Sequence, residues 1–174
     1  MIIIITGATH TGKTLLAQRL LEKYEYPYLS IDHLKMGLIR GGYTALTAED
    51  DDEMTVYIWP VVREIIKTAV ENKQNLIVEG CYVPFDWRKD FTDRYLENIK
   101  IICLAMTDEY IDSHIDEINL RASAIEARDE TLTAEYLKAE NGFYINGFEK
   151  SGEKVTLIRE DYEKTIGSIL NGTE

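Results

Sequence analysis

The sequence predicts a three-layer α/β domain built on a parallel five-stranded sheet, and two features of the chain support this fold class. Short apolar runs alternate with longer segments of helical pattern, as in strand–helix–strand units joined by right-handed crossovers. The runs are continuously apolar, which is typical of strands that are covered on both faces. The predicted strands are Ile2–Thr6, Tyr26–Ile31, Leu76–Glu79, Ile99–Ala105 and Val155–Ile158.

Helical patterns fill the intervals between these strands. No internal repeat, low-complexity tract or linker separates one part of the chain from another, so residues 1–174 are expected to form one domain. The predicted helices are Lys13–Tyr24, Asp32–Arg40, Asp52–Asn72, Asp86–Asn98, Asp108–Ala127, Ala134–Asn141 and Asp161–Leu170.

The composition limits the partners of the protein. Of its 174 residues, 45% are hydrophobic and 29% are charged, which suits a globular domain with a sizeable core. The formal net charge of −12, from 31 acidic and 19 basic residues, argues against nucleic acid as a partner, because a phosphate backbone requires a basic surface. A local basic pocket for a small phosphorylated ligand is compatible with this charge.

The cysteines and the first residues indicate the compartment. Cys81 and Cys103 lie in or beside apolar runs without a partner at metal-ligand spacing, so buried thiols in a reducing environment are expected. The apolar run Met1–Ile5 is too short for a membrane span or a signal peptide. We therefore expect a cytoplasmic protein without a membrane partner, either a monomer or a homodimer.

Residues Gly7–Thr14 carry the most specific motif of the chain. They read G-A-T-H-T-G-K-T and match the phosphate-binding pattern G-x-x-x-x-G-K-[ST] between a predicted strand and a predicted helix. Lys13 would reach the β- and γ-phosphates of a nucleotide, and the Thr14 hydroxyl would hold Mg²⁺. The alternative is an ordinary glycine-rich turn. The residues expected to contact the nucleotide are Gly7, Thr9, His10, Thr11, Gly12, Lys13, Thr14 and Leu15.

Asp32 directly follows the second predicted strand. In an open α/β sheet, ligands bind beyond the carboxyl ends of the strands, so this carboxylate is expected to face the phosphates. It could accept a proton from a substrate hydroxyl, or contact Mg²⁺ through water. The alternative is that Asp32 only caps the helix that follows.

Glu79 and Gly80 close the third predicted strand. An acidic residue at such a strand end is the usual holder of Mg²⁺ opposite the loop threonine, so Glu79 is a metal and substrate candidate. Gly80 would let a substrate approach the backbone closely. The alternative is that Glu79 is an ordinary surface carboxylate.

Several arginines could bind charged groups. Arg121 and Arg128 are seven residues apart, so they share a face if their helix continues, and either could stabilise a transferred phosphoryl group or contact the nucleotide. Arg121 is slightly favoured as the catalytic donor, although Glu117, four residues earlier, could simply pair with it. Candidates for binding an anionic acceptor, each alternatively an ordinary surface arginine, are Arg40, Arg63 and Arg88.

The chain resembles the small P-loop kinases of the nucleoside-monophosphate-kinase-like group in its loop, in Asp32, in the Glu79–Gly80 strand end and in the later arginines. This group includes adenylate, shikimate and gluconate kinases, chloramphenicol phosphotransferase and the zeta-type toxins. The resemblance implies a P-loop NTPase fold with strand order 2-3-1-4-5, an arginine-bearing helical lid, ATP and Mg²⁺ as cofactors, and Asp32 as general base. After the third strand, residues 79–88 match neither the adenylate kinase run D-G-[FY]-P-R nor the tandem glycines of shikimate kinases, so neither substrate carries over.

The leading functional hypothesis is ATP- and Mg²⁺-dependent phosphoryl transfer to a hydroxyl of a small-molecule acceptor. Residues 41–72 would cover the acceptor site and residues 107–154 would include the lid. One alternative is a nucleoside monophosphate kinase, whose acceptor is already ionised and needs no base. The other is a nucleotide-binding switch or ATPase that acts through a protein partner. A guanine-specific N-K-x-D motif is not matched, since residues 72–75 read N-K-Q-N before a strand.

Overall fold

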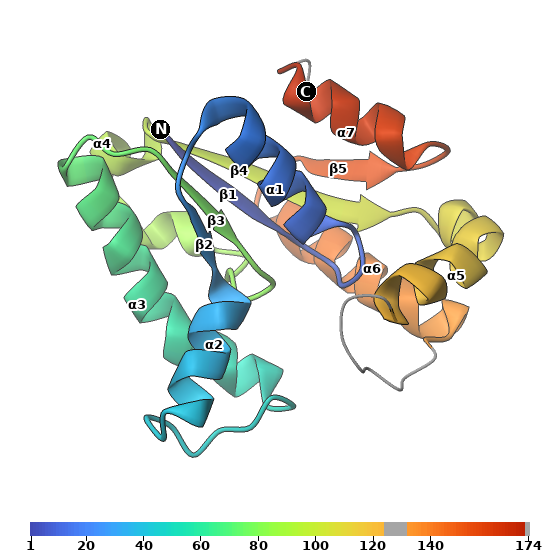
Figure 1. The fold of residues 1–174 in the computed structure, drawn as a ribbon, viewed down its shortest axis with the longest axis horizontal. Helices are drawn as coiled ribbons and strands as arrows, with labels where there is room; N and C mark the ends of the chain where they lie inside the picture. The colour runs from blue at the N-terminus through green and yellow to red at the C-terminus, as the bar shows by residue number, and fades with distance from the viewer. Residues whose placement is uncertain (124–131, 173–174) are drawn as a thin grey trace. The chain divides into compact units, whose positions relative to one another are not determined.

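The computed structural model describes residues 1–123 and 132–172. Its elements alternate along the chain between strands and helices, as the sequence predicts (Figure 1). In chain order they are β1 (Ile2–Gly7), α1 (Lys13–Tyr24), β2 (Tyr28–Ser30), α2 (Ile31–Arg40), α3 (Asp51–Glu71), β3 (Leu76–Glu79), η1 (Trp87–Asp90), α4 (Asp93–Leu96), β4 (Ile99–Met106), α5 (Asp108–Ser123), α6 (Ala134–Lys150), β5 (Val155–Ile158) and α7 (Tyr162–Leu170).

The five strands form one sheet in the order β2-β3-β1-β4-β5, which confirms the predicted fold (Figure 1). The strand pairs β1–β3, β2–β3 and β4–β5 are parallel. All residues of the central strand β1 are buried, which explains its unbroken apolar run. Because parallel strands end at the same edge, Ser30 and Glu79 are paired neighbours at the ends of β2 and β3.

The backbone groups into two compact units. Unit 1 comprises residues 1–6 and 13–102, and unit 2 comprises residues 7–12 and 103–174. The boundary passes between Gly12 and Lys13, within the motif that the sequence singles out.

In unit 1, the long helix α3 buries one apolar face. Met54, Ile58, Val62 and Ile66 recur every fourth residue and are fully buried. Helix α1 likewise buries Leu16, Ala17 and Leu20.

In unit 2, helices α5 and α6 share a core with the ends of β4 and β5. Tyr162, the first residue of α7, packs against this core. The buried residues of the cluster are Met106, Tyr110, Ile111, Ile118, Leu137 and Ile158. No helix in the described part of the chain is long and apolar enough to cross a membrane.

The single helix predicted over residues 86–98 is wrong. The segment forms the short 3-10 helix η1 and the short helix α4, with Phe91 extended between them. Trp87 and Phe91 are buried in edge-to-face contact, and Asp90 accepts hydrogen bonds from the Trp59 indole (2.7 Å) and Arg63 (3.0 Å). These tertiary contacts to α3 replace the continuous helix.

Other boundaries also differ from the prediction, most of them by one residue. The second strand is shorter, because Ser30 caps α2 and Ile31 becomes its first residue. Helix α6 continues to Lys150 through two glycines and buries Phe148 completely. The helix predicted over residues 108–127 is helical through Ser123, and the remainder of that prediction lies outside the described residues.

Candidate functional site

The segment Gly7–Thr14, here called the phosphate loop, connects β1 to α1 as predicted. Three of its residues have positive φ: Gly7 (126°), His10 (61°) and Gly12 (76°). The Thr11 hydroxyl donates to the Ala8 carbonyl at 2.8 Å and closes the turn. When right-handed and left-handed backbone conformations alternate, successive N–H groups can point toward one centre, and such a concave group of N–H donors binds anions.

Both motif glycines are required by close contacts within unit 2. A Cβ on Gly7 would lie 2.0 Å from the carbonyl oxygen of Leu104, and one on Gly12 would lie 2.0 Å from the Tyr162 hydroxyl. That hydroxyl donates to the Gly12 carbonyl at 3.2 Å. The loop is therefore held tightly against β4 and α7, and no larger residue fits at either glycine.

The start of α1 brings Thr14 to Glu79 in unit 1. The Thr14 hydroxyl donates to Glu79 Oε1 at 3.3 Å, and Glu79 is only 2% exposed. The alternative of an exposed surface carboxylate is therefore wrong. Lys13 is also buried, while Leu15 on the same turn is exposed.

Tyr28 completes this cluster, and sequence reasoning missed it. Its hydroxyl donates to Glu79 Oε2 at 2.8 Å, so each carboxylate oxygen of Glu79 accepts one hydroxyl. Tyr28 lies two residues before Ser30 on β2, the strand that pairs with β3. The sequence indicates this contact only through the spacing of Tyr28 from the strand end, because residues two apart in a strand point to the same face of the sheet.

The electrostatics of the cluster follow from its burial. Desolvation raises the pKa of Glu79, whereas the hydrogen bonds from Tyr28 and Thr14 and the charge of Lys13 act to lower this pKa. Burial and the nearby Glu79 charge raise the pKa of Tyr28, which keeps its hydroxyl protonated as a donor. Glu79 is thus a buried carboxylate held by neutral hydroxyls.

Asp32 lies exposed in the first turn of α2. The cap of this helix is Ser30, whose Oγ accepts the His33 N–H at 3.4 Å, so the alternative that Asp32 is the cap is wrong. Within the described residues, the Asp32 side chain forms no hydrogen bond or ion pair. Its charge is one of the smaller causes that raise the pKa of Glu79 and of Tyr82.

Gly80 is buried beside Asp32's helix. Its φ is +157°, and a Cβ there would lie 2.8 Å from the Ile31 Cβ. Helix α2 therefore requires glycine at this position, because any side chain would clash with Ile31 and push the helix that carries Asp32 away from β3.

The predicted arginines have different surroundings. Arg121 pairs with Glu117 at 2.6 Å, as the alternative anticipated, and its guanidinium also lies 5.9 Å from the centre of the Tyr162 ring. Arg128 lies outside the described residues. Arg40 ends α2 and is exposed.

Arg88 and Arg63 contact the aromatic cluster of unit 1. The Arg88 guanidinium lies 5.0 Å from the centre of the Trp87 ring, and Arg63 pairs with Asp90 at 3.0 Å. No contact joins Arg40, Arg63 or Arg88 to Asp32 or Glu79 in the part of the chain that the structure covers.

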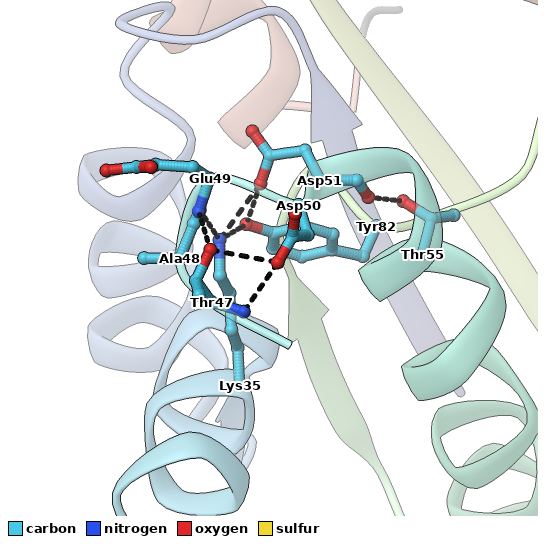
Figure 2. Close-up of polar contacts among 8 residues, drawn as sticks. All are labelled: Lys35, Thr47, Ala48, Glu49, Asp50, Asp51, Thr55 and Tyr82. Atoms are coloured by element: carbon cyan, nitrogen blue, oxygen red, sulfur yellow. Dashed lines mark hydrogen bonds and ion pairs between the residues drawn. The ribbon is translucent and has the colours of Figure 1, made fainter. Parts of the chain in front are cut away.

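A second polar cluster, which sequence reasoning missed entirely, surrounds Lys35 (Figure 2). Lys35 is 6% exposed, and its Nζ donates to the Ala48 carbonyl (2.7 Å), to Asp51 Oδ1 (2.9 Å) and to the Tyr82 hydroxyl. The Tyr82 hydroxyl in turn donates to Asp51 at 2.9 Å. The cluster fastens the segment before α3 to α2, one helical turn after Asp32.

The donor set beside the phosphate loop fits Mg²⁺. A threonine hydroxyl and a carboxylate are hard oxygen ligands, and Mg²⁺ usually takes only one or two carboxylates and completes its shell with water and substrate phosphates. Residues 1–123 and 132–172 hold no group of three or more His, Cys, Asp or Glu side chains arranged for a metal ion.

Comparison with known proteins identifies the fold. No family model matches the chain, and no curated protein matches it in sequence. Solved structures do match over nearly its whole length. A gluconokinase from Sinorhizobium meliloti has a TM-score of 0.57 at 13% identity, covering 98% of this chain and 89% of that one.

Two further structures agree. A deoxyadenosine kinase from M. mycoides has a TM-score of 0.58 at 16% identity and covers 99% of this chain and 98% of its own. A putative kinase from Chloroflexus aurantiacus has a TM-score of 0.58 at 18% identity and covers 99% and 95%. The fold is therefore that of the small P-loop kinases, as the resemblance implied.

Proposed function

We propose that the protein transfers a phosphoryl group from ATP to a hydroxyl of a small molecule, with Mg²⁺. The observation that carries this proposal is the contact between Thr14 and the buried Glu79 at the start of α1. It joins the last residue of the phosphate loop to a strand-end carboxylate, which is the arrangement that phosphoryl transfer requires around its metal.

The residues of unit 1 have separate roles in this proposal. Lys13 binds the terminal phosphates, and Thr14 and Glu79 would hold Mg²⁺, which neutralises charge on the phosphates when it is bound. Asp32 accepts the proton of the acceptor hydroxyl. An exposed carboxylate that has no partner among the described residues suits this role, since a substrate can reach it without breaking a described contact. In unit 2, Arg121 is the proposed lid cation, because the Tyr162 ring beneath it contacts Gly12.

The exposed Asp32 favours a hydroxyl acceptor over a nucleoside monophosphate. A hydroxyl must lose its proton as it attacks, whereas a phosphate acceptor is already ionised and needs no base. The names of the matching structures, gluconokinase and deoxyadenosine kinase, are consistent with this proposal.

The test is ADP release from ATP and Mg²⁺ across a panel of hydroxylated metabolites, antibiotics and nucleoside monophosphates. We expect turnover that depends on one acceptor class and that Lys13→Ala abolishes. Asp32→Asn is expected to lower kcat by about 10²–10⁴-fold, the usual contribution of a general base. Asp93→Asn is the matched control, because Asp93 is another exposed aspartate in the first turn of a helix.

Each other outcome selects an alternative. Turnover with a nucleoside monophosphate that Asp32→Asn largely retains would favour a monophosphate kinase. Tight ATP binding without stimulation by any acceptor would favour the nucleotide-binding switch.

A further inference from the structure

A carboxylate from helix α6 contacts the phosphate loop. Glu140 of α6 accepts the backbone N–H of Thr9 at 3.0 Å through Oε1, although 131 residues separate the two positions. Its other oxygen, Oε2, is buried. Both residues belong to unit 2. A negative charge therefore lies against the segment that would receive the phosphates of a nucleotide.

The position of Glu140 is fixed by its helix. The next residue, Asn141, is 1% exposed; its Oδ1 accepts the Met106 N–H at 2.6 Å and its Nδ2 donates to the Leu137 carbonyl at 2.7 Å. Leu137 is fully buried in the core of unit 2. Because α6 is anchored to the end of β4 on either side of Glu140, the carboxylate cannot leave the loop by a shift of the helix end.

The phosphate loop is anchored from its other side as well. The Ala8 N–H donates to the Leu104 carbonyl at 3.2 Å, and the Gly12 carbonyl accepts the Tyr162 hydroxyl. Glu140 thus contacts a loop whose shape is already held by uncharged groups. The feature that Glu140 adds is its charge.

We propose, on the basis of the proposed function, that Glu140 is a specificity-determining residue that makes the phosphate loop select metal-complexed polyphosphate over the free polyanion. A free triphosphate is repelled by a carboxylate on the same loop. A triphosphate whose charge is reduced by bound Mg²⁺ is repelled much less. Glu140 does not take part in the chemical step; it sets the charge state of the nucleotide that the loop accepts.

The test measures the affinity of inorganic tripolyphosphate by titration calorimetry, once in EDTA and once with excess Mg²⁺. The main variant is Glu140→Gln, which keeps an oxygen acceptor for the Thr9 N–H and removes the charge. We expect free tripolyphosphate to bind at least about tenfold more tightly to this variant, from the removal of one like charge near the site. We expect the affinity for the Mg²⁺ complex to change by less than about threefold.

Two further variants separate charge from structure. Glu140→Ala also removes the charge and is small enough to fold if Gln is not tolerated, so both variants should reduce the selectivity for the Mg²⁺ complex alike. Glu135→Gln, a surface change in the first turn of the same helix, should leave this selectivity as in the wild type.

Two outcomes would overturn the inference, and they are distinguishable. If tripolyphosphate binds and Glu140→Gln leaves the selectivity for the Mg²⁺ complex unchanged, Glu140 has only a structural role and the proposed function stands. If the wild type binds tripolyphosphate neither in EDTA nor with Mg²⁺, the phosphate site itself is absent and both proposals fail.

Discussion

Glu79 and Lys35, two buried charged residues of unit 1, are stabilised in opposite ways. Lys35 is surrounded by three oxygens, one of them the Asp51 carboxylate, so its charge is neutralised by the protein (Figure 2). Among the described residues, Glu79 accepts two neutral hydroxyls, from Thr14 and Tyr28, and the charge of Lys13 also acts on it.

This difference separates a structural charge from a functional one. When a buried ion has a counter-ion within the protein, the attraction between them offsets the cost of removing the charge from water, and the pair holds its two segments together. A buried carboxylate with only neutral donors keeps its negative charge available, which suits it to a cation that arrives with a substrate. We therefore assign Lys35 to the architecture of unit 1 and Glu79 to its chemistry.

Glu79→Gln should have the largest effect on activity. Gln has the same shape but only one acceptor oxygen, so it can accept one of the two hydroxyls and must donate its amide N–H to the other, and it lacks the charge that would attract Mg²⁺. We expect kcat for acceptor-dependent ADP release to fall by about 10²–10³-fold, as for loss of one preorganised electrostatic contact. Glu97→Gln, an exposed change in the same unit, is the control. An activity near that of the wild type would show that Glu79 is structural.

Glu79→Gln also tests the contrast between Glu79 and Lys35 through the pH dependence of the free energy of unfolding. Burial raises the pKa of Glu79 above 4.5, so the folded protein binds this proton more tightly than the unfolded chain does. The resulting stabilisation is complete below that value and is lost as the pH rises through the folded-state pKa. In metal-free buffer, urea unfolding should show wild-type stability declining relative to Glu79→Gln from about pH 4.5 towards neutrality. A constant difference between the two proteins would contradict the raised pKa.

Lys35→Met should mainly affect stability. It removes the shared donor, so the Ala48 carbonyl loses this partner and the Tyr82 hydroxyl keeps only its bond to Asp51, at an expected cost of about 2–3 kcal/mol. We expect kcat at saturating acceptor to stay within about threefold of the wild type. Thermal and urea unfolding measure the first effect, and ADP release measures the second.

The control and the contrary outcome for Lys35 are clear. Lys89→Met, which breaks the exposed ion pair between Lys89 and Asp86 in the same unit, should leave the free energy of unfolding nearly unchanged, because solvent can replace either partner. If Lys35→Met instead abolished turnover with little loss of stability, the lysine would belong to the acceptor site and the contrast with Glu79 would fail.

Tyr28→Phe should have the smallest effect of these changes. It removes one of the two hydroxyls that orient Glu79 and keeps the ring, so we expect a loss of about 1 kcal/mol, or roughly fivefold in kcat. Tyr95→Phe removes a similar hydroxyl–carboxylate contact, with Glu71, on the exposed surface and should leave kcat unchanged. Equal effects of the two variants would mean that Tyr28 has no special role.

Sequence alone was most informative where the signal is local. The phosphate loop is one continuous motif, and the strands Leu76–Glu79 and Val155–Ile158 were predicted with their observed bounds. The helix predicted over residues 86–98 failed because a non-local aromatic cluster competes with helix propensity there. Asp32 and Glu79 could be proposed because parallel strands end at a common edge.

By itself, the sequence determined the alternation of strands and helices, the glycine-dependent loop and the strand-end carboxylates, since each depends on residues close together in the chain. Tertiary structure alone decided which charges are neutralised. Tyr28 reaches Glu79 through the pairing of β2 with β3, Lys35 meets Asp51 and Tyr82 from three separate segments, and Glu140 reaches Thr9 from a distant helix. Hydrogen bonds and charge interactions depend on distance in space, and packing brings together partners whose spacing along the chain carries no signal.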